Sequence, residues 1–416
     1  MDFEYRYTSD QELFRKEVND WLDANVPEGM KPHFASDAAH MDKETFRWAK
    51  EFRQKFGEKG WLFPTWPKEY GGGGLTAEHD VIIQEEVSKR RLPGFRPSEL
   101  MPAAVMVWGD EDQKQRFVTP TLEGKRDLYQ LFTEPGAGSD LASLKTRAVK
   151  DGDDWVINGE KVFVGTHHGY KNGPDSEPEI DEEVDEMFTL AITDPDAPRH
   201  RNMGYFMIPG DAPGVTYQTL DLLADWGKLQ IYLDNVRVPN DRLIGGEGQG
   251  WQVAQTSLEL EHGGGGQIVQ RDHPTLRFLE LASETGRAKD PHYQQTMMDA
   301  YIDSEIGRLF GLRNYWMYES KQEMSYHGSQ AMLWRKESVL RIADATRDVL
   351  GLEALVDLDD PKVKFDGELE HFQRDSLVWA HPGGTIEVQK VIVARRLGVS
   401  RTKERAATTP STAGKQ

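Results

Sequence analysis

The chain has 416 residues, 38% of them hydrophobic and 10% aromatic, which indicates a folded protein with two or three packed units. A formal net charge of −20 argues against nucleic acid or an anionic membrane surface as a partner, and the absence of cysteine excludes disulfides and a cysteine nucleophile. We find no apolar run long enough to span a membrane and no signal-peptide pattern at the start, so we expect a soluble, cytoplasmic protein.

The first third of the chain is predicted to be helical. Ser9 and Glu12 have the spacing of a capping box, and apolar residues then recur at helical intervals. A second apolar pattern, at residues 46–56, predicts a helix that ends near Gly57, because glycine is unfavourable inside helices. After a loop rich in proline and glycine, a third helix is expected at residues 80–89.

The pattern changes to strands near residue 128. Residues 154–164 form two β-rich runs around Asn158-Gly159, which predicts a hairpin with its turn at that dipeptide. The stretch 172–185, rich in Asp, Glu, Pro and Gly, is expected to be a solvated loop and not a metal site. Further strands are expected at residues 187–192, 205–208 and 230–238.

Helical periodicity returns at residue 250 and continues to about residue 399, with a charged interruption at residues 361–367. The order of helices, strands and helices predicts an α+β protein. The expected domains are an all-α domain at 1–127, a β domain at 128–240, a helical-bundle domain at 241–400 and a disordered tail at 401–416.

Residues 133–140, with the sequence TEPGAGSD, are the most informative segment of the chain. Pro135, Gly136 and Gly138 among polar residues are incompatible with a regular helix or a central strand, so they predict a tightly turned loop. Exposed backbone N–H groups and hydroxyls suit a phosphate or the polar edge of a ring, because the glycines let a ligand approach the backbone.

The TEPGAGSD segment resembles the flavin-binding signature of acyl-CoA dehydrogenases. Two further blocks resemble this family in the same order, GDDWVINGEK at residues 152–161 and GTIEVQ at residues 384–389. The resemblance covers nearly the full chain and implies an N-terminal helical domain, a central β-barrel-like domain and a C-terminal four-helix-bundle domain. It also implies a flavoprotein oxidoreductase of fatty acid or steroid degradation that binds FAD and forms a dimer or tetramer.

Carried over by position, the resemblance assigns FAD contacts to several residues of this chain. Backbone around Phe132 and the Thr133 hydroxyl would meet the pyrimidine edge of the flavin, and Ser139 would lie toward the pyrophosphate. Phe163 would replace the tryptophan that usually lies beside the ring. The remaining residues assigned to the cofactor are Gly138, Gly165, Thr166, Arg287, Thr385 and Glu387.

Desaturation of an acyl-CoA removes a proton α to the thioester carbonyl, which requires a carboxylate base in a dry pocket. In many members of the family this base precedes the last block, where this chain has Gly383, which has no side chain for the task. The alternative, resembling isovaleryl-CoA dehydrogenases, is a Glu on the first long helix of the C-terminal domain. Glu261 falls on the apolar face of that predicted helix, whereas Glu259 falls on the polar face with Gln252 and Gln255, so we assign Glu261 as the catalytic base.

The segment after the base predicts a bulky substrate. Each glycine of residues 263–266 costs a helix roughly 1 kcal/mol relative to alanine, and space for a large acyl group would explain them. Gly265 falls near the Glu261 face and would widen the acyl cavity, and His262 is either a substrate contact or a partly buried histidine. By resemblance, Ser139, Gly383 and Gly384 would also lie beside the substrate. We therefore expect a branched, ring-bearing or steroid side-chain acyl group.

Some positions depart from the family pattern. Gly165 stands where many relatives have a threonine that hydrogen-bonds near flavin N5, and Thr166 is adjacent but shifted. An expected arginine is missing before Gly286, although Arg287 is close by. These departures resemble the actinobacterial steroid-type branch, in which two different chains assemble and share flavin sites. A homo-oligomer with altered FAD contacts is the alternative.

Three functions are open from the sequence. The first is an acyl-CoA dehydrogenase that passes electrons to an electron-transfer flavoprotein, and the second is a flavin-dependent oxidase or monooxygenase of the same fold. The third is a flavin-poor, non-catalytic subunit of a heteromeric enzyme. Glu261 favours the first. No metal is predicted, because the histidine pairs at 167–168 and at 371 and 381 lack a carboxylate at ligand spacing.

Overall fold

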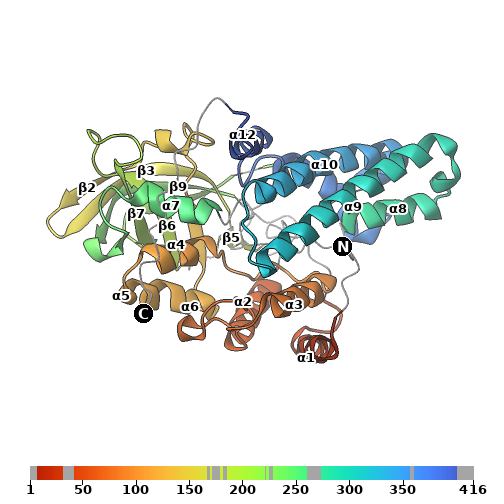
Figure 1. The fold of residues 1–416 in the computed structure, drawn as a ribbon, viewed down its shortest axis with the longest axis horizontal. Helices are drawn as coiled ribbons and strands as arrows, with labels where there is room; N and C mark the ends of the chain where they lie inside the picture. Colours follow the sequence, from red (N-terminus) through yellow and green to blue (C-terminus); the bar gives the residue numbers. More distant parts are fainter. Residues whose placement is uncertain are drawn as a thin grey trace. The chain divides into compact units, whose positions relative to one another are not determined.

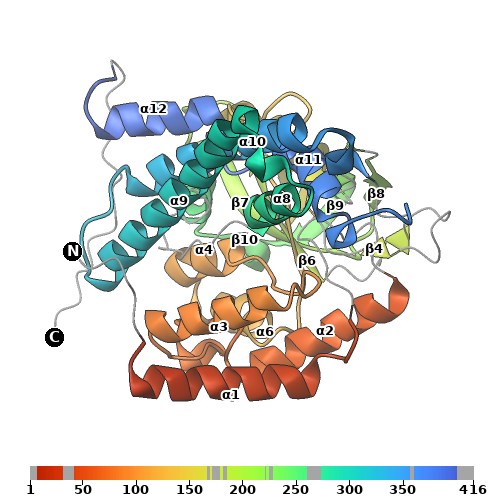
Figure 2. The same ribbon diagram turned by 90° about the vertical axis from the view of Figure 1, so that its right-hand side faces the viewer.

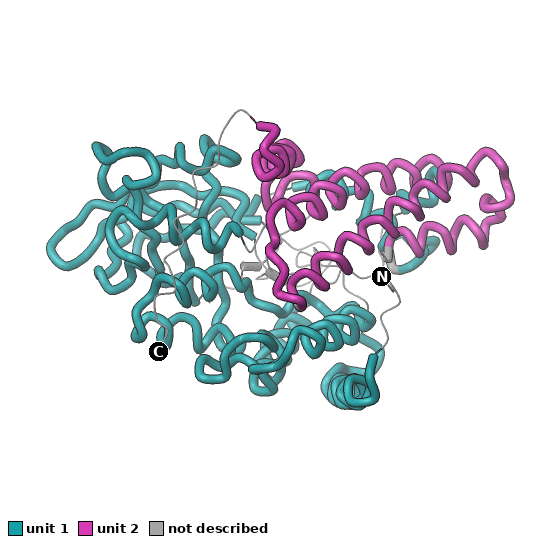
Figure 3. Tube along the Cα trace, in the orientation of Figure 1, with its two compact units in different colours: residues 1–261, 351–378 teal, residues 262–350, 379–416 magenta. Residues whose placement is uncertain are grey.

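The computed structural model of the protein contains two compact units. Unit 1 contains Met1–Glu261 and Gly351–Val378, and unit 2 contains His262–Leu350 and Trp379–Gln416 (Figure 3). Among the residues that the structure describes, no helix combines the length and apolar character needed to cross a bilayer. The described residues are 7–30, 42–165, 169–170, 179–180, 185–220, 222–223, 228–259, 273–356 and 360–400.

Unit 1 begins with the predicted helices, although the first helix begins one residue earlier than expected. The prediction of Ser9 and Glu12 as a capping box is wrong, because Thr8 is the N-cap and exchanges hydrogen bonds with Gln11. Thr8 and Ser9 both carry a hydroxyl, and each is followed three residues later by Gln11 or Glu12. Spacing alone therefore does not distinguish the two possible capping boxes. The helical segments are α1 (Ser9–Asn25), α2 (Lys43–Glu58), α3 (Ala77–Lys89), α4 (Leu100–Trp108), α5 (Glu111–Gln113), η3 (Lys114–Val118) and α6 (Thr119–Leu122) (Figure 2).

The middle of unit 1 is an eight-stranded sheet with the order β10-β7-β6-β2-β3-β9-β8, and β1 pairs in parallel with β6. The α+β class is confirmed, and the sheet is open, with β10 and β8 at its ends. A separate pair is formed by β4 (Gly169–Tyr170) and β5 (Glu179–Ile180). The strands of the large sheet are β1 (Leu128–Leu131), β2 (Arg147–Asp151), β3 (Asp154–Val164), β6 (Glu186–Ile192), β7 (Met203–Pro209), β8 (Val215–Thr219), β9 (Leu229–Pro239) and β10 (Leu243–Ile244).

Both faces of the sheet are covered. On β6, Phe188 and Leu190 pack in one core with the N-terminal helices, whereas Met187 and Ala191 pack in a second core formed by the sheet. Successive side chains of a strand point to opposite faces, so a strand that is covered on both sides has a continuous apolar sequence. This explains why β6 and β7 are recognisable in the sequence, and the predicted strands there are confirmed.

The predicted hairpin turn at Asn158-Gly159 is wrong. β3 runs through this dipeptide, and the hairpin joins β2 to β3 across Gly152-Asp153. Gly152 has a φ of 64°, a left-handed conformation that favours glycine at a tight turn. The chain therefore contains two sites with turn-like sequence, and the turn forms at the first.

Asn158 and Gly159 lie at an irregularity in the pairing of β3 with β9. The side-chain Oδ1 of Asn158 accepts a 2.9 Å hydrogen bond from the backbone N–H of Asn235. A Cβ at position 159 would lie 2.2 Å from Thr146 Oγ1, a distance that no side chain tolerates. The close contact with Thr146, and not a turn, therefore explains why position 159 is a glycine.

The helix α7 (Gly250–Glu259) packs against β6 and β7 on one side and against α4 on the other (Figure 1). Gly250 allows the close approach, because a Cβ there would lie 2.5 Å from the carbonyl carbon of Gly204. Near the other end of α7, Ser257 Oγ donates a 2.8 Å hydrogen bond to Leu100 O. The helix is therefore fixed to its neighbours near both ends.

Unit 2 is helical, which confirms the prediction for the C-terminal part of the chain. The helix α10 packs against the other three long helices of the unit. Between two parts of unit 2 the chain returns to unit 1, where residues 361–367 interrupt the helices as expected. The short segments η8 (Gly351–Leu355) and η9 (Phe365–Gly367) precede α11 (Glu368–Trp379) there. The predicted tail and most of the predicted loop at 172–185 lie outside the described residues. The long helices are α8 (His273–Glu284), α9 (Pro291–Glu319), α10 (His327–Leu350) and α12 (Ile386–Arg396).

We predict that Gly159→Ala destabilises the protein, because the new Cβ would force Thr146 or β3 to move. Overpacking of this kind typically costs about 1–3 kcal/mol, measurable from urea unfolding curves. Gly136→Ala is the matched control, since a Cβ at that position would meet no atom within 4 Å. Equal stability of the two variants would contradict the importance of the Thr146 contact.

Candidate active site

The segment 133–140 forms the tight turn that its composition predicts. It follows β1, and the backbone N–H groups of Glu134 and Ala137 each donate to the carbonyl of the other, both at 3.0 Å. Gly136 and Gly138 are exposed, and a Cβ at either would meet no atom within 4 Å. The surface of this loop is therefore open to a ligand.

A buried ion pair holds the base of the loop. Lys161 on β3 is fully buried, and its Nζ lies 2.9 Å from Glu134 Oε1, 3.1 Å from Leu190 O and 3.4 Å from Phe132 O. The three acceptors match the three protons of an ammonium group. Through one side chain, β3 is thus joined to the beginning of the loop and to β6.

The Glu134 carboxylate is also bound by the segment before β2. The backbone N–H of Lys145 donates to Oε2 at 2.6 Å, and the backbone N–H and hydroxyl of Thr146 donate to Oε1 at 3.0 Å and 2.5 Å. Burial alone would raise the pKa of Glu134, but Lys161 and these hydrogen bonds hold it below its ordinary value. The carboxylate is therefore ionised and well hydrogen-bonded, as a buried charge requires.

The loop lies beside the end of β3, where further predicted flavin contacts are found. Val162 N donates to Thr133 O at 2.9 Å. Phe163 follows with a φ of 57° and is 56% exposed, which is unusual for a large apolar side chain. Gly165 comes directly after β3 and is also exposed.

These residues fit the needs of FAD. The hydroxyls of Thr133 and Ser139 have no hydrogen-bond partner within the described part of the chain and are free to bind a polar ligand. The exposed Phe163 ring offers an aromatic surface, and the open glycines of the loop permit a close approach to the backbone. Phe132, Thr133, Gly138, Ser139, Phe163 and Gly165 all belong to this region of unit 1.

A second group of predicted residues belongs to unit 2. Gly383 and Gly384 have φ values of 66° and 77° and lead into α12, whose N-cap Thr385 accepts a hydrogen bond from Val388 N at 3.3 Å. Hydrogen bonds from its own backbone N–H and from the Thr385 side chain lower the pKa of the exposed Glu387. The first N–H groups of a helix suit an anion or a polar ring edge.

The turn before α12 is anchored by a second buried lysine. Lys336 of α10 is 2% exposed, and its Nζ donates to Trp379 O at 3.0 Å and to Pro382 O. Sequence reasoning identifies neither Lys161 nor Lys336 as a functional residue. The signal that could have identified Lys161 is a charged residue on a strand whose other inward positions are apolar.

Arg287 belongs to unit 2. Arg287 begins the short segment η7 (Arg287–Lys289) and donates from Nη1 to Leu350 O, the last carbonyl of α10. This contact suits a helix C-terminus. Thr166, Glu261, His262 and Gly265 lie outside the described residues.

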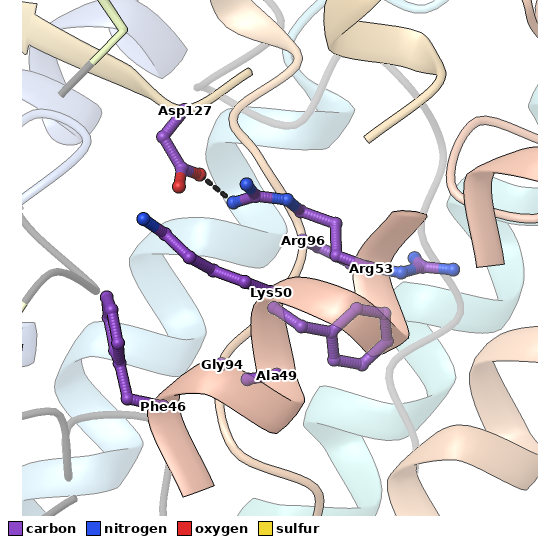
Figure 4. A pocket seen from close by; sticks show the side chains of 8 residues that line it. Phe46, Ala49, Lys50, Arg53, Gly94, Arg96 and Asp127 are labelled. Atoms are coloured by element: carbon purple, nitrogen blue, oxygen red, sulfur yellow. Dashed lines mark hydrogen bonds and ion pairs between the residues drawn. The ribbon is translucent and has the colours of Figure 1, made fainter. Parts of the chain in front are cut away.

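Two hollows in the described part of the chain are lined by other residues than those predicted to bind FAD. In unit 1, a cavity of about 20 Å³ lies beside the buried ion pair of Arg53 and Asp127 and is also lined by Phe46, Lys50 and Arg96 (Figure 4). This volume holds roughly one water molecule. In unit 2, a hollow of about 360 Å³ between α9 and α10 is lined largely by aspartates. No three His, Asp or Glu side chains in the described ranges form a metal site.

Comparison with known proteins identifies the family. Residues 8–125 match the N-terminal domain, residues 130–172 the middle domain and residues 248–398 the C-terminal domain of acyl-CoA dehydrogenases. The chain therefore belongs to the acyl-CoA dehydrogenase family, an oxidoreductase family whose members bind FAD.

Individual relatives are similar over nearly their whole length. Acyl-CoA dehydrogenase IpdE1 of Mycobacterium tuberculosis is 28% identical over 403 residues, which cover 94% of this chain and 98% of the relative. Among solved structures, the Tcur3481-Tcur3483 steroid ACAD is 25% identical, with a TM-score of 0.77 over 97% of this chain and 100% of its own. The ChsE4-ChsE5 complex from Mycobacterium tuberculosis shares the fold, with 24% identity and a TM-score of 0.76 over 97% of this chain and 100% of its own.

We predict that Lys161→Met destabilises the protein by about 3–5 kcal/mol, because it leaves the Glu134 carboxylate buried without its cation. Adding Glu134→Gln in the same chain should recover part of this loss, since both charges are then removed. Urea unfolding of both single variants and the double variant measures the coupling.

The control for this cycle is Lys150→Met, which breaks the half-exposed pair of Lys150 and Glu247. A surface ion pair contributes about 0–1 kcal/mol to stability, so the free energy of unfolding of this variant should be close to that of the unsubstituted protein. A Lys161→Met variant as stable as the Lys150→Met control would contradict the account of the buried pair.

Proposed function

We propose that this protein is an FAD-dependent acyl-CoA dehydrogenase that converts an acyl-CoA into its trans-2-enoyl-CoA, with Glu261 as the base. The family membership and FAD follow from the domain matches. The assignment of the base rests on one observation, the exposure pattern along α7.

On α7, Gln255 and Glu259 are exposed, whereas Ala254 and Ser257 are buried. At about 100° per residue, a continuation of α7 would bring Glu261 onto the buried side, one turn beyond Ser257. A carboxylate is costly on that side of a helix unless it has a role there, and proton abstraction is such a role. Glu259 faces solvent and is unsuited to the task.

Hydrogen bonds near the end of α7 support this assignment. Ser257 donates to Leu100 O at 2.8 Å, and Trp108 Nε1 donates to Thr256 Oγ1 at 2.9 Å. Both partners belong to α4, so two consecutive residues of α7 are fixed to the same helix. A base carried by a helix fixed in this way keeps its orientation toward the substrate, which proton transfer requires.

Bound FAD supplies the acceptor for the hydride that leaves the β carbon. The Glu261 carboxylate would take the proton from the α carbon, a step that Gly383 has no side chain to perform. The Thr133 hydroxyl would hold the polar edge of the cofactor, and Phe163 would cover its ring. Burial of Glu261 against the acyl chain would raise its pKa and so make it a stronger base.

The first test of this proposal is Glu261→Gln. We expect kcat to fall by roughly 10²- to 10⁴-fold, the range for loss of a general base, while FAD remains bound. Glu259→Gln is the control and should change kcat by less than about twofold, because Glu259 is exposed. Near wild-type turnover of the Glu261→Gln variant with intact flavin would contradict the assignment.

The substrate that we propose is a bulky acyl-CoA with a branched, ring-bearing or steroid-derived acyl group. Residues 263–266 are four glycines that begin two residues after the proposed base, and a solved relative is named a steroid ACAD. Small residues beside the acyl group would leave space for a ring. Electrons would then pass to an electron-transfer flavoprotein, and a second chain would complete the enzyme.

We predict that cyclic acyl-CoAs have a kcat/KM at least tenfold higher than short straight-chain acyl-CoAs, because a wide cavity leaves a thin chain poorly packed. Steady-state turnover with a panel of acyl-CoAs and an artificial electron acceptor measures this preference. A preference for short straight chains would exclude the bulky substrate and leave the dehydrogenase assignment intact.

A further inference from the structure

Lys228 and Gly165 lie together at the end of β3 that carries Phe163. Val164, the last residue of β3, pairs with Leu229, the first residue of β9. Gly165 follows this pair on one strand, and Lys228 precedes it on the other. A Cβ at position 165 would lie 2.7 Å from Lys228 Nζ, so the ammonium group occupies the space of a side chain at that position.

We propose that Lys228 supplies the hydrogen-bond donor and positive charge beside the bound flavin, in place of the hydroxyl that position 165 lacks in this chain. This inference rests on the proposed FAD-dependent function. It explains two observations together, the glycine at a position that faces the cofactor in the family resemblance and the lysine that approaches it.

The surroundings of Lys228 connect it to the other flavin-binding residues. Phe163 lies on β3 two residues before Gly165, and Val162 N donates a hydrogen bond to Thr133 O. The ammonium group therefore lies near the end of β3 at which Phe163 is exposed and to which the Thr133 backbone is bonded. The backbone of Lys228 is held by Leu220 N, which donates to its carbonyl at 2.8 Å.

Because Lys228 is partly buried, its positive charge can act strongly on a bound flavin. Burial lowers the pKa of Lys228 to about 8, so the ammonium is the major form at neutral pH. A cation that is partly removed from water interacts more strongly with a nearby charge than a solvated one. Reduction adds two electrons to the flavin, so a neighbouring cation binds the reduced cofactor more tightly and raises its reduction potential.

The same cation could bind a phosphate of CoA instead of the flavin. The geometry favours the flavin, because Lys228 Nζ lies beside Gly165, which is two residues after the exposed Phe163. The two ligands predict different results, since only a contact with the flavin changes its reduction potential when no acyl-CoA is present.

The test is the midpoint potential of FAD-loaded protein without substrate, for the unsubstituted protein and for Lys228→Met. We expect the variant to bind reduced FAD about tenfold more weakly relative to oxidised FAD, which lowers the two-electron potential by about 30 mV. The Lys228→Arg variant should have a midpoint potential close to that of the unsubstituted protein. Adding Gly165→Ser to Lys228→Met should reverse part of the fall in potential, because the serine hydroxyl would occupy the space that the lysine leaves.

Lys150→Met is the matched control, since Lys150 is a half-exposed lysine of the same sheet that pairs with Glu247. Its potential should equal that of the unsubstituted protein. An unchanged potential in Lys228→Met, including the case in which only the KM for acyl-CoA rises, would overturn the assignment of Lys228. Failure of the unsubstituted protein to bind FAD would instead overturn the proposed function itself.

Discussion

The contact between Lys161 and Glu134 is the interaction on which the proposed flavin-binding side of unit 1 depends. Two charges removed from water are stable only when their polar atoms have partners. Here Lys161 also binds the carbonyls of Phe132 and Leu190, and the segment before β2 supplies three donors to Glu134. Gly159 belongs to the same arrangement, because it makes room for the Thr146 side chain that binds Glu134. Loss of any one member would leave a buried polar group unsatisfied.

Both segments that the family resemblance assigns to the flavin are anchored in the same way. Lys161 binds backbone carbonyls at the start of the loop and in β6, and Lys336 binds two carbonyls of the turn before α12. The buried ammonium groups fix the backbone of both turns, and the open Gly136 and Gly138 leave the loop surface accessible to a ligand. This arrangement suits a cofactor whose polar edges and phosphates are largely hydrogen-bond acceptors.

The sequence predicts elements that arise from local patterns, which is why β6, β7 and the helices lie where the periodicity indicates. It does not predict contacts between distant residues. Asn158-Gly159 has a strong local preference for a turn, but the contact between Gly159 and Thr146 and the pairing with Asn235 decide its conformation. Likewise, Lys161 and Glu134 are 27 residues apart, and no local pattern connects them. The turn at residues 133–140 was predictable because its composition excludes regular structure.

The central claim is that this chain holds FAD on the loop at 133–140 and uses it to oxidise an acyl-CoA. The most direct measurement is an anaerobic titration of the purified protein with a ring-bearing acyl-CoA while the visible absorption of the flavin is recorded. The account predicts a yellow protein whose flavin band is lost as about one equivalent of the acyl-CoA is added. A colourless protein that takes up no added FAD, or a bound flavin that no acyl-CoA reduces, would contradict it.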